Sequence, residues 1–134
     1  MVRNYRTKAA FVKHYSVNIM RMRSLYHPRV QEITVEGILY ALADPIRVQI
    51  CLQLARSRRA MNCSAFRRIQ KKTLPKSTLS QHFRILREAG LIHSERQGVE
   101  LINLTRCGEL EERFGPMIRG ILDAYARQCG SAKK

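Results

Sequence analysis

The first half of the chain places apolar residues at the three- and four-residue spacing that is typical of helices. This pattern predicts a helix over Thr34–Ala43 and a second one from Pro45 to about Ala55. Asp44 stands directly before Pro45, and this pair predicts the end of the first helix and the N-cap of the second. After a polar break, Ser64 is expected to cap a short third helix that ends near Gln70.

A fourth helix is predicted from Pro75 or Lys76 to Ala89, after a short turn, and its two faces differ in chemistry. Leu79, Phe83 and Leu86 fall on one narrow arc and should face the core. The opposite arc is polar and cationic, and its single acid lies in the last turn. Gly90 is expected to end this helix.

A strand pair and a long helix are predicted for the rest of the chain. Leu91–Gln97 and Val99–Thr105 have the pattern of strands, and Gly98 between them predicts the tip of a hairpin. The last helix should begin near Arg106 and end near Cys129. Gly115-Pro116 should kink or interrupt it, because proline lacks the backbone N–H.

This order of elements predicts a winged helix-turn-helix fold, mainly α with a small β-hairpin. We divide the chain into a basic N-terminal arm (1–30), a winged helix-turn-helix DNA-binding domain (31–105), and a C-terminal dimerisation helix with a basic tail (106–134). A short helix around Phe11–Arg23 is a further expectation within the arm.

The chain is strongly basic, and its charge is unevenly placed. Lysine and arginine number 25 against 10 acids, which gives a formal net charge of +15. No acid occurs between Asp44 and Glu88, whereas half of the acids follow residue 99. Such a distribution favours a polyanionic partner. This partner is more often a nucleic acid than a membrane surface. A merely solvated face is the alternative, but solvated faces usually mix both signs.

The exposed arc of the fourth helix suits base edges in a major groove. Gln pairs with adenine and Arg with guanine, and the N-terminal end of such a helix usually enters the groove. The residues predicted to read bases are Lys76, Ser77, Thr78, Ser80, Gln81 and Arg84. Those predicted to contact the DNA backbone are Arg67, Arg68, Lys71, Lys72 and Arg87, and the wing would add Arg96 and Gln97. A surface helix without a partner explains the apolar arc equally well, but not the one-sided charge.

Two segments carry a family resemblance. Ala41-Leu42-Ala43-Asp44-Pro45-Ile46-Arg47-Val48 resembles the opening signature of the ArsR/SmtB repressors, and Lys76–Ile92 resembles their recognition helix and the start of the wing. The resemblance covers about Val30–Gln128. It implies a homodimer that binds an inverted repeat in double-stranded DNA, usually as a repressor released by a signal. It also implies that the first and last helices form the dimer interface.

The predicted last helix carries an apolar stripe with nothing after it to pack against. The stripe favours a seam between two subunits, and the alternative is that it folds back on its own domain. The residues predicted for the dimer interface are Val35 and Leu39 on the first helix and Leu110, Phe114, Met117, Ile118, Ile121, Leu122 and Tyr125 on the last.

The family that the chain resembles often senses metals, through paired cysteines on the third helix or through His and carboxylate ligands on the last. Here the third-helix segment holds one thiol, Cys63, and no His occurs from Arg106 to Lys134. We therefore expect no metal site and no cofactor. An unknown organic effector bound between helices is an alternative.

A redox switch is a further hypothesis. Cys107 lies near a helix start, where the helix dipole can lower a thiol pKa, and Cys129 lies near an exposed end. Cys51 stands at a core position, where cysteines are usually inert.

The sequence predicts a sequence-specific DNA-binding transcription regulator, expected to be a repressor and not an enzyme, because no catalytic motif occurs. No apolar run is long enough for a signal peptide or a membrane span, so we expect a cytoplasmic protein without a membrane partner. The main alternative is a nonspecific architectural nucleic-acid-binding protein, whose affinity would depend on charge alone and collapse with salt. A module that binds only other proteins would require DNA binding to be absent.

Overall fold

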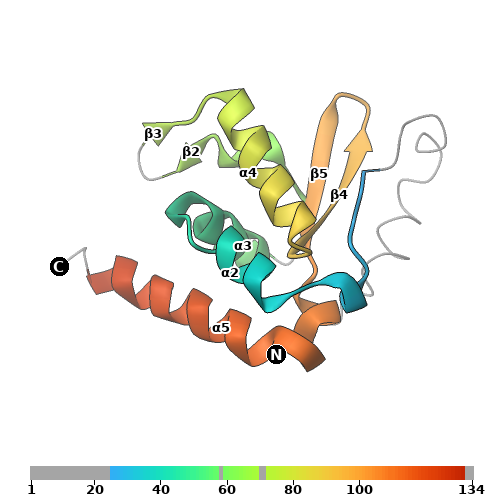
Figure 1. Ribbon diagram of the computed structural model, residues 1–134. Helices are drawn as coiled ribbons and strands as arrows, with labels where there is room; N and C mark the ends of the chain where they lie inside the picture. The colour runs from blue at the N-terminus through green and yellow to red at the C-terminus, as the bar shows by residue number, and fades with distance from the viewer. Residues whose placement is uncertain (1–24, 58, 70–71, 132–134) are drawn as a thin grey trace.

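The computed structural model describes residues 25–57, 59–69 and 72–131 (Figure 1). The helix expected at 11–23, and most of the basic arm, lie outside the described residues. The helical elements are the 3-10 turn η2 (Val30–Glu32), α2 (Val35–Ala41), α3 (Pro45–Ser57), the 3-10 turn η3 (Cys63–Phe66), α4 (Lys76–Glu88) and α5 (Cys107–Ser131). The strands are β1 (Met61–Asn62), β2 (Arg68–Ile69), β3 (Lys72–Thr73), β4 (Ile92–Gln97) and β5 (Glu100–Thr105).

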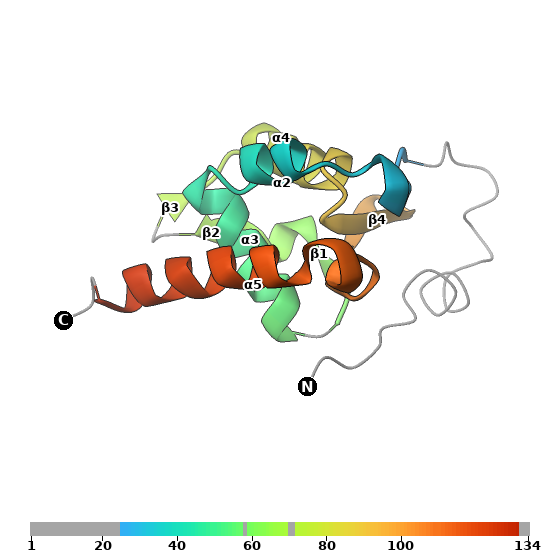
Figure 2. The same cartoon turned by 60° about the horizontal axis from the view of Figure 1, so that its bottom comes forward.

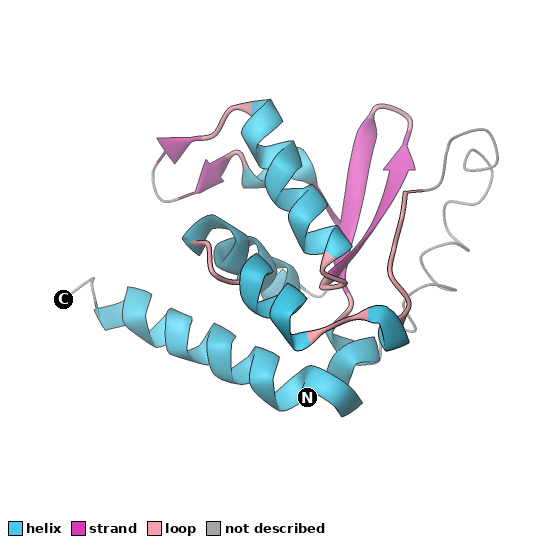
Figure 3. Cartoon of the chain, viewed as in Figure 1, coloured by secondary structure: helices cyan, strands magenta, loops and turns pink. Residues whose placement is uncertain are grey.

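The strands form two antiparallel sheets within the described part of the chain (Figure 3). One sheet has the order β1-β5-β4, and β4 with β5 forms the wing, in which Arg96 pairs with Leu101. Gly98, with a φ of 59°, turns the chain at the wing tip. The other sheet is the short β2–β3 hairpin. The helices followed by the β4–β5 hairpin confirm the predicted winged helix-turn-helix fold.

Side-chain caps explain where α2 and α3 begin. The Thr34 hydroxyl accepts the Gly37 N–H at 3.1 Å, and the Asp44 carboxylate accepts the Ile46 N–H at 2.8 Å and the Arg47 N–H at 3.1 Å. These bonds satisfy backbone donors that the first helical turn leaves free. The predicted N-cap at Asp44 is therefore confirmed.

The predicted third helix over Ser64–Gln70 is wrong. The segment forms only one 3-10 turn, η3, which Asn62 caps by accepting the Ala65 N–H at 3.1 Å. The chain then turns back as the β2–β3 hairpin, and the Leu74 N–H donates to the Arg67 carbonyl at 2.8 Å. The hairpin satisfies backbone groups that a longer helix would have paired internally, so the helix ends after one turn.

The hydrophobic core lies between α3, α4 and α5. Leu79, Phe83 and Leu86 are almost fully buried, as the pattern of α4 predicts. Phe83 meets Phe66 of η3 edge to face, with the ring centroids 5.3 Å apart. Fully burying such apolar side chains contributes roughly 1.5–3 kcal/mol each. These contacts fix which face of α4 points away from the protein.

Helix α5 lies along the side of the molecule and packs against α3 (Figure 2). Leu110, Phe114, Ile118 and Leu122 are buried in the core of this same chain. A side chain already packed on its own domain has little surface left for a partner, and the part of these four in a dimer interface stays a prediction. The alternative, a stripe folded back on its own domain, holds for these four.

Pro116 lies inside α5, which continues without a break from Cys107 to Ser131. Of the kink or interruption predicted at Gly115-Pro116, the interruption is wrong, because a proline removes a single donor from a helix whose apolar side is held by the core. The lack of a Cβ at Gly115 leaves room for the Glu111 carboxylate, which forms an ion pair with Arg119.

Asn103 is the polar centre of the three-stranded sheet. Its side chain is completely buried. The amide nitrogen donates to the Met61 carbonyl at 3.3 Å, and the amide oxygen accepts the Ser94 hydroxyl at 2.7 Å. Asn103 thus joins β1, β4 and β5 through one side chain, a connection that the sequence pattern did not predict.

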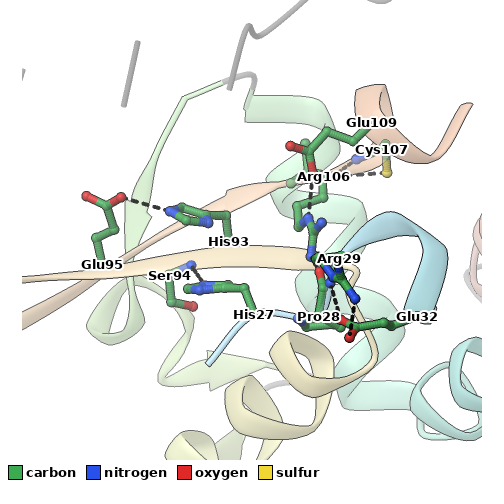
Figure 4. Close-up of polar contacts among 11 residues, drawn as sticks. His27, Pro28, Arg29, Glu32, His93, Ser94, Glu95, Arg106, Cys107 and Glu109 are labelled. Atoms are coloured by element: carbon green, nitrogen blue, oxygen red, sulfur yellow. Dashed lines mark hydrogen bonds and ion pairs between the residues drawn. The ribbon is translucent and has the colours of Figure 1, made fainter. Parts of the chain in front are cut away.

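Residues 25–33, which we call the strap, run beside β4, the edge strand of the wing (Figures 1 and 4). His27 Nε2 accepts the Ser94 N–H of β4 at 2.9 Å, and the His27 ring stacks on His93 with centroids 4.2 Å apart. Arg106 donates to the Pro28 carbonyl at 2.8 Å. Burial, together with the neighbouring His93, lowers the pKa of His27 to about 4. The strap therefore binds the wing with a neutral imidazole.

Replacing Asn103 with Leu should lower the free energy of unfolding by about 1–3 kcal/mol, because the buried Ser94 hydroxyl loses its acceptor. Urea denaturation of the wild type, Ser94→Ala, Asn103→Leu and the double variant measures this effect. The double variant should lose less than the sum of the two single losses. Strictly additive losses would show that the Ser94–Asn103 bond contributes nothing.

Stability should also depend on the protonation of His27. The pKa of His27 is lower in the fold than its usual 6.5. The stability that the neutral ring contributes is therefore fully present above pH 6.5. The contribution is lost as the pH falls through about 4. His27→Gln keeps a side-chain acceptor for the Ser94 N–H but does not titrate in this range. In denaturant titrations at successive pH values, the wild type should lose more stability on acidification than this variant. Parallel curves would contradict the role of His27.

Candidate nucleic-acid interface

The outward face of α4 carries all of the residues predicted to read bases. Leu79, Phe83 and Leu86 hold one face in the core, so the positions opposite them turn toward solvent. The exposed residues of this face are Lys76, Ser77, Thr78, Ser80, Gln81 and Arg84. They form one surface of hydrogen-bonding and cationic groups, which suits the donors and acceptors along a base edge.

The N-terminal end of α4 is open to an anion. Pro75 occupies the N-cap position and provides no side-chain acceptor for the first backbone N–H groups. The first turn contains Lys76 and no acid. Free N–H groups, the positive end of the helix dipole and a lysine together favour a phosphate at this end.

Arg84 forms an ion pair with Glu88 one turn later, with Nε and Oε1 3.0 Å apart. Both side chains are more than half exposed, and such pairs contribute little to stability in water. Arg84 can therefore exchange Glu88 for a guanine edge or a phosphate at small cost.

The tip of the wing and the N-terminal end of α4 lie on the same side of the molecule, away from α5 (Figures 1 and 3). Arg96 is exposed near this tip, and Gln97 is partly exposed. Val99, beside Gly98, is 98% exposed. The residues predicted from the sequence do not include Val99. Its position as an apolar residue next to the turn glycine was the sequence signal that could have placed it at the exposed tip.

The residues predicted to contact the DNA backbone differ in how exposed they are and in whether the structure describes them. Arg67 is exposed directly after η3. Arg68 and Lys72 lie on β2 and β3, where only the backbone is described, and Lys71 lies outside the described residues. Arg87 is half-buried, and its Nη1 is shielded from solvent without a hydrogen-bond partner among the described residues, so its contact with DNA stays a prediction. Burial lowers the pKa of this guanidinium.

Arg47 connects α4 to the two preceding helices. The Arg47 side chain is buried and donates to the Ala41 carbonyl at 2.6 Å and to the Tyr40 carbonyl at 3.1 Å, at the end of α2. Its Nη1 lies 3.5 Å from Nδ1 of His82 on α4. Burial lowers the pKa of His82, which favours a neutral ring next to this cation. This contact joins α3 to α4 at a position next to the exposed face of α4.

The surroundings of Cys107 do not support the reactivity that was expected of it. Burial raises the pKa of Cys107, although it stands at the start of α5, and the Thr105 hydroxyl lies 2.9 Å from its sulfur. The expectation that the helix dipole lowers this pKa is therefore wrong. Burial also raises the pKa of Cys51 and of Cys63. Cys129 is partly exposed near the end of α5, and its redox role stays a prediction.

Two further properties of the described residues bear on other functions. No group of three or more His, Cys, Asp or Glu side chains is placed to hold a metal ion there. No single helix in residues 25–57, 59–69 and 72–131 is long and apolar enough to cross a membrane. Together α2 and α3 would be long and apolar enough, but a bend of 101° separates them.

Comparison with known proteins agrees with this geometry. Residues 42–95 match a family of helix-turn-helix domains. A stretch of 65 residues, 48% of this chain, is 37% identical to the HTH-type transcriptional repressor SmtB of Mycobacterium tuberculosis, from strains CDC 1551 / Oshkosh and ATCC 25618 / H37Rv alike. The match spans 45% of that repressor, a little under half of its length. Residues 42–95 of this chain therefore match a helix-turn-helix domain, and about half of the chain is similar to an SmtB repressor.

Proposed function

We propose that this protein is a sequence-specific DNA-binding transcription regulator, and that it acts as a repressor by binding an inverted repeat as a homodimer. The observation that carries the proposal is the exposed face of α4, which is polar, cationic and free of acids until its last turn. The wing tip lies on the same side and supplies a second contact to the same duplex. The similarity to a known repressor supports the direction of regulation.

The chemistry of α4 assigns roles along the helix. Its N-terminal turn would meet a phosphate, which positions the protein without reading sequence. Gln81 and Arg84 lie deeper along the exposed face, where Gln pairs with adenine and Arg with guanine in the major groove. Each well-formed bidentate pair discriminates against a wrong base by about 1–3 kcal/mol.

The homodimer is proposed from the apolar surface that the core leaves open. On α2, Val35 is 44% exposed and Leu39 is 50% exposed, and Tyr40 is exposed beside them. Met117, Ile121 and Tyr125 of α5 are only partly buried. A two-fold axis through such a surface would place two α4 helices on one face of the DNA, with half-sites about one helical turn apart.

Replacing both Gln81 and Arg84 with Ala should abolish sequence-specific binding, because both base-reading side chains are removed. Gel shifts with DNA from upstream of the protein's own gene, at physiological salt and with excess nonspecific competitor, measure this effect. If that DNA contains no binding site, selection from a genomic library supplies one. The matched control is Arg127→Ala with Gln128→Ala, since both residues are exposed on α5.

Loss of specific binding in the α4 variant but not in the control supports base reading by Gln81 and Arg84. Weak binding that is unchanged in the α4 variant, and that competitor and salt abolish, would contradict a sequence-specific regulator. That result would favour an architectural nucleic-acid-binding protein instead.

Replacing Leu39 with Glu should convert a dimer into a monomer, because it places a carboxylate in the apolar α2 surface. Sedimentation velocity without DNA at micromolar concentration gives the mass. Val99→Glu is the control, since it changes an exposed apolar residue that lies far from α2 in the sequence and on the wing. A monomeric wild type would contradict the homodimer, and a dimeric Leu39→Glu variant would exclude α2 as the interface.

A further inference from the structure

The guanidinium of Arg47 joins the end of α2 to the flank of α4. Its Nε donates to the Ala41 carbonyl at 2.6 Å, and its Nη2 donates to the Tyr40 carbonyl at 3.1 Å. Its Nη1 lies 3.5 Å from Nδ1 of His82. These contacts use three nitrogens of one buried, planar group. A shift of α4 relative to the end of α2 would therefore break at least one of them.

Further contacts hold the Arg47 side chain in this position. Oδ2 of Asp44 lies 3.9 Å from Nη1 of Arg47, while Oδ1 of the same carboxylate caps α3. The guanidinium carbon lies 5.5 Å from the centroid of the Tyr40 ring, within the range of a cation–π contact. The Arg47 side chain is only 10% exposed. A buried cation with these partners has one position, so it can hold α4 at a fixed place relative to α2.

The two ends of this connection lie beside the two surfaces that the proposed function uses. Tyr40 is 65% exposed and belongs to the α2 surface through which the homodimer is proposed. His82 directly follows Gln81 on α4 and lies one helical turn after Thr78. Both Gln81 and Thr78 are exposed and are predicted to read bases. Helices α2, α3 and α4 lie next to one another (Figures 1 and 2), and the guanidinium on α3 connects the other two.

The contact between Arg47 and His82 requires a neutral imidazole. A guanidinium has only donors, so Nδ1 of His82 must accept and cannot carry a proton. Burial lowers the pKa of His82, the Asp44 carboxylate raises it, and the Arg47 cation lowers it. The resulting pKa lies below the usual 6.5, which favours the neutral ring at neutral pH. Protonation would place two donors against each other and break the contact.

We infer that Arg47, acting through His82, holds α4 at a fixed position relative to the α2 surface and so determines which spacing of two half-sites the homodimer accepts. This inference rests on the proposed function and concerns the same base-reading helix. A dimer reads an inverted repeat only when the separation of its two recognition helices matches that of the half-sites. Arg47 is a positioning residue, because it acts on DNA only through α4.

The test compares duplexes that differ only in the distance between their half-sites. One duplex carries the operator, two others shorten or lengthen its centre by about two base pairs, and a fourth retains a single half-site. Dissociation constants are measured above pH 6.5 for the wild type, His82→Leu and His82→Asn. His82→Leu removes the acceptor for Arg47, whereas His82→Asn places an amide oxygen near the position of Nδ1. Circular dichroism and sedimentation velocity confirm that the three proteins have the same fold and mass.

The wild type should prefer the operator over the altered spacings, and His82→Leu should reduce this preference by about three- to tenfold, because a less restrained α4 accommodates other spacings. His82→Asn should retain the preference. On the single half-site, the three proteins should bind equally. Wild-type spacing preference in His82→Leu, or equal losses in both variants, would overturn the inference. The same loss on the single half-site as on the operator would overturn it too, because His82 would then affect reading within each half-site.

The pH dependence of the spacing preference tests the neutral ring. In the wild type, the preference should be complete above pH 6.5 and should fall as the pH passes through the lowered pKa of His82. His82→Asn should keep its preference over the same range, because the amide does not titrate. All other titrating groups are common to both proteins, so the difference between the two curves reports His82. Parallel curves would overturn the role of the neutral ring.

The failure of this inference is distinguishable from that of the proposed function. If the wild type binds the operator as a dimer and His82→Leu keeps its spacing preference, the function stands and the inference fails. If the wild type is monomeric or binds all duplexes equally, the proposed function fails. Nitrogen NMR without DNA then still tests the connection, since the Nε–H signal of Arg47 should shift as His82 is protonated. A proton on Nδ1 of the neutral ring, or an Arg47 signal that does not respond, would overturn the contact.

Discussion

The burial of one face of α4 is the constraint on which the rest of the interface depends. Leu79, Phe83 and Leu86 leave water together, and Phe83 packs edge to face on Phe66. A helix with one side fixed in this way can present only its opposite side to a partner. The polar face is therefore oriented by the hydrophobic core, and Arg47 further fixes its position through the contact with His82.

Buried polar contacts hold the wing in one arrangement, as the apolar core holds α4. Asn103 joins three strands, and the neutral His27 ring holds the strap on the edge strand. Such bonds contribute modestly when formed but are costly to leave unmade, so they specify one arrangement. The wing is thus held at a fixed position relative to α4. In the proposed function, α4 and the wing would contact the same duplex.

Much of this arrangement could be predicted because it depends on local patterns. The apolar spacing of α4, the Asp44 cap and the glycine at the wing tip act over a few residues, and each was visible in the sequence. Long-range contacts were not visible. The helix predicted at Ser64–Gln70 gave way to a hairpin, and the terminal apolar stripe packed largely on its own domain. The packing of the stripe depends on partners distant in the chain, whereas the hairpin pairs Arg68 with Thr73 and Ile69 with Lys72, which are close in the sequence.

The sequence by itself determined the winged helix-turn-helix order, the acid-free stretch around α4 and the polar residues on its exposed arc. Helical periodicity and charge are properties of neighbouring residues, so no tertiary information was needed. Only the tertiary structure decided that Arg87 is half-buried, that burial raises the pKa of Cys107, and that His27 binds β4. Burial depends on which distant segments cover a side chain, and His27 and Ser94 meet across 67 residues of sequence.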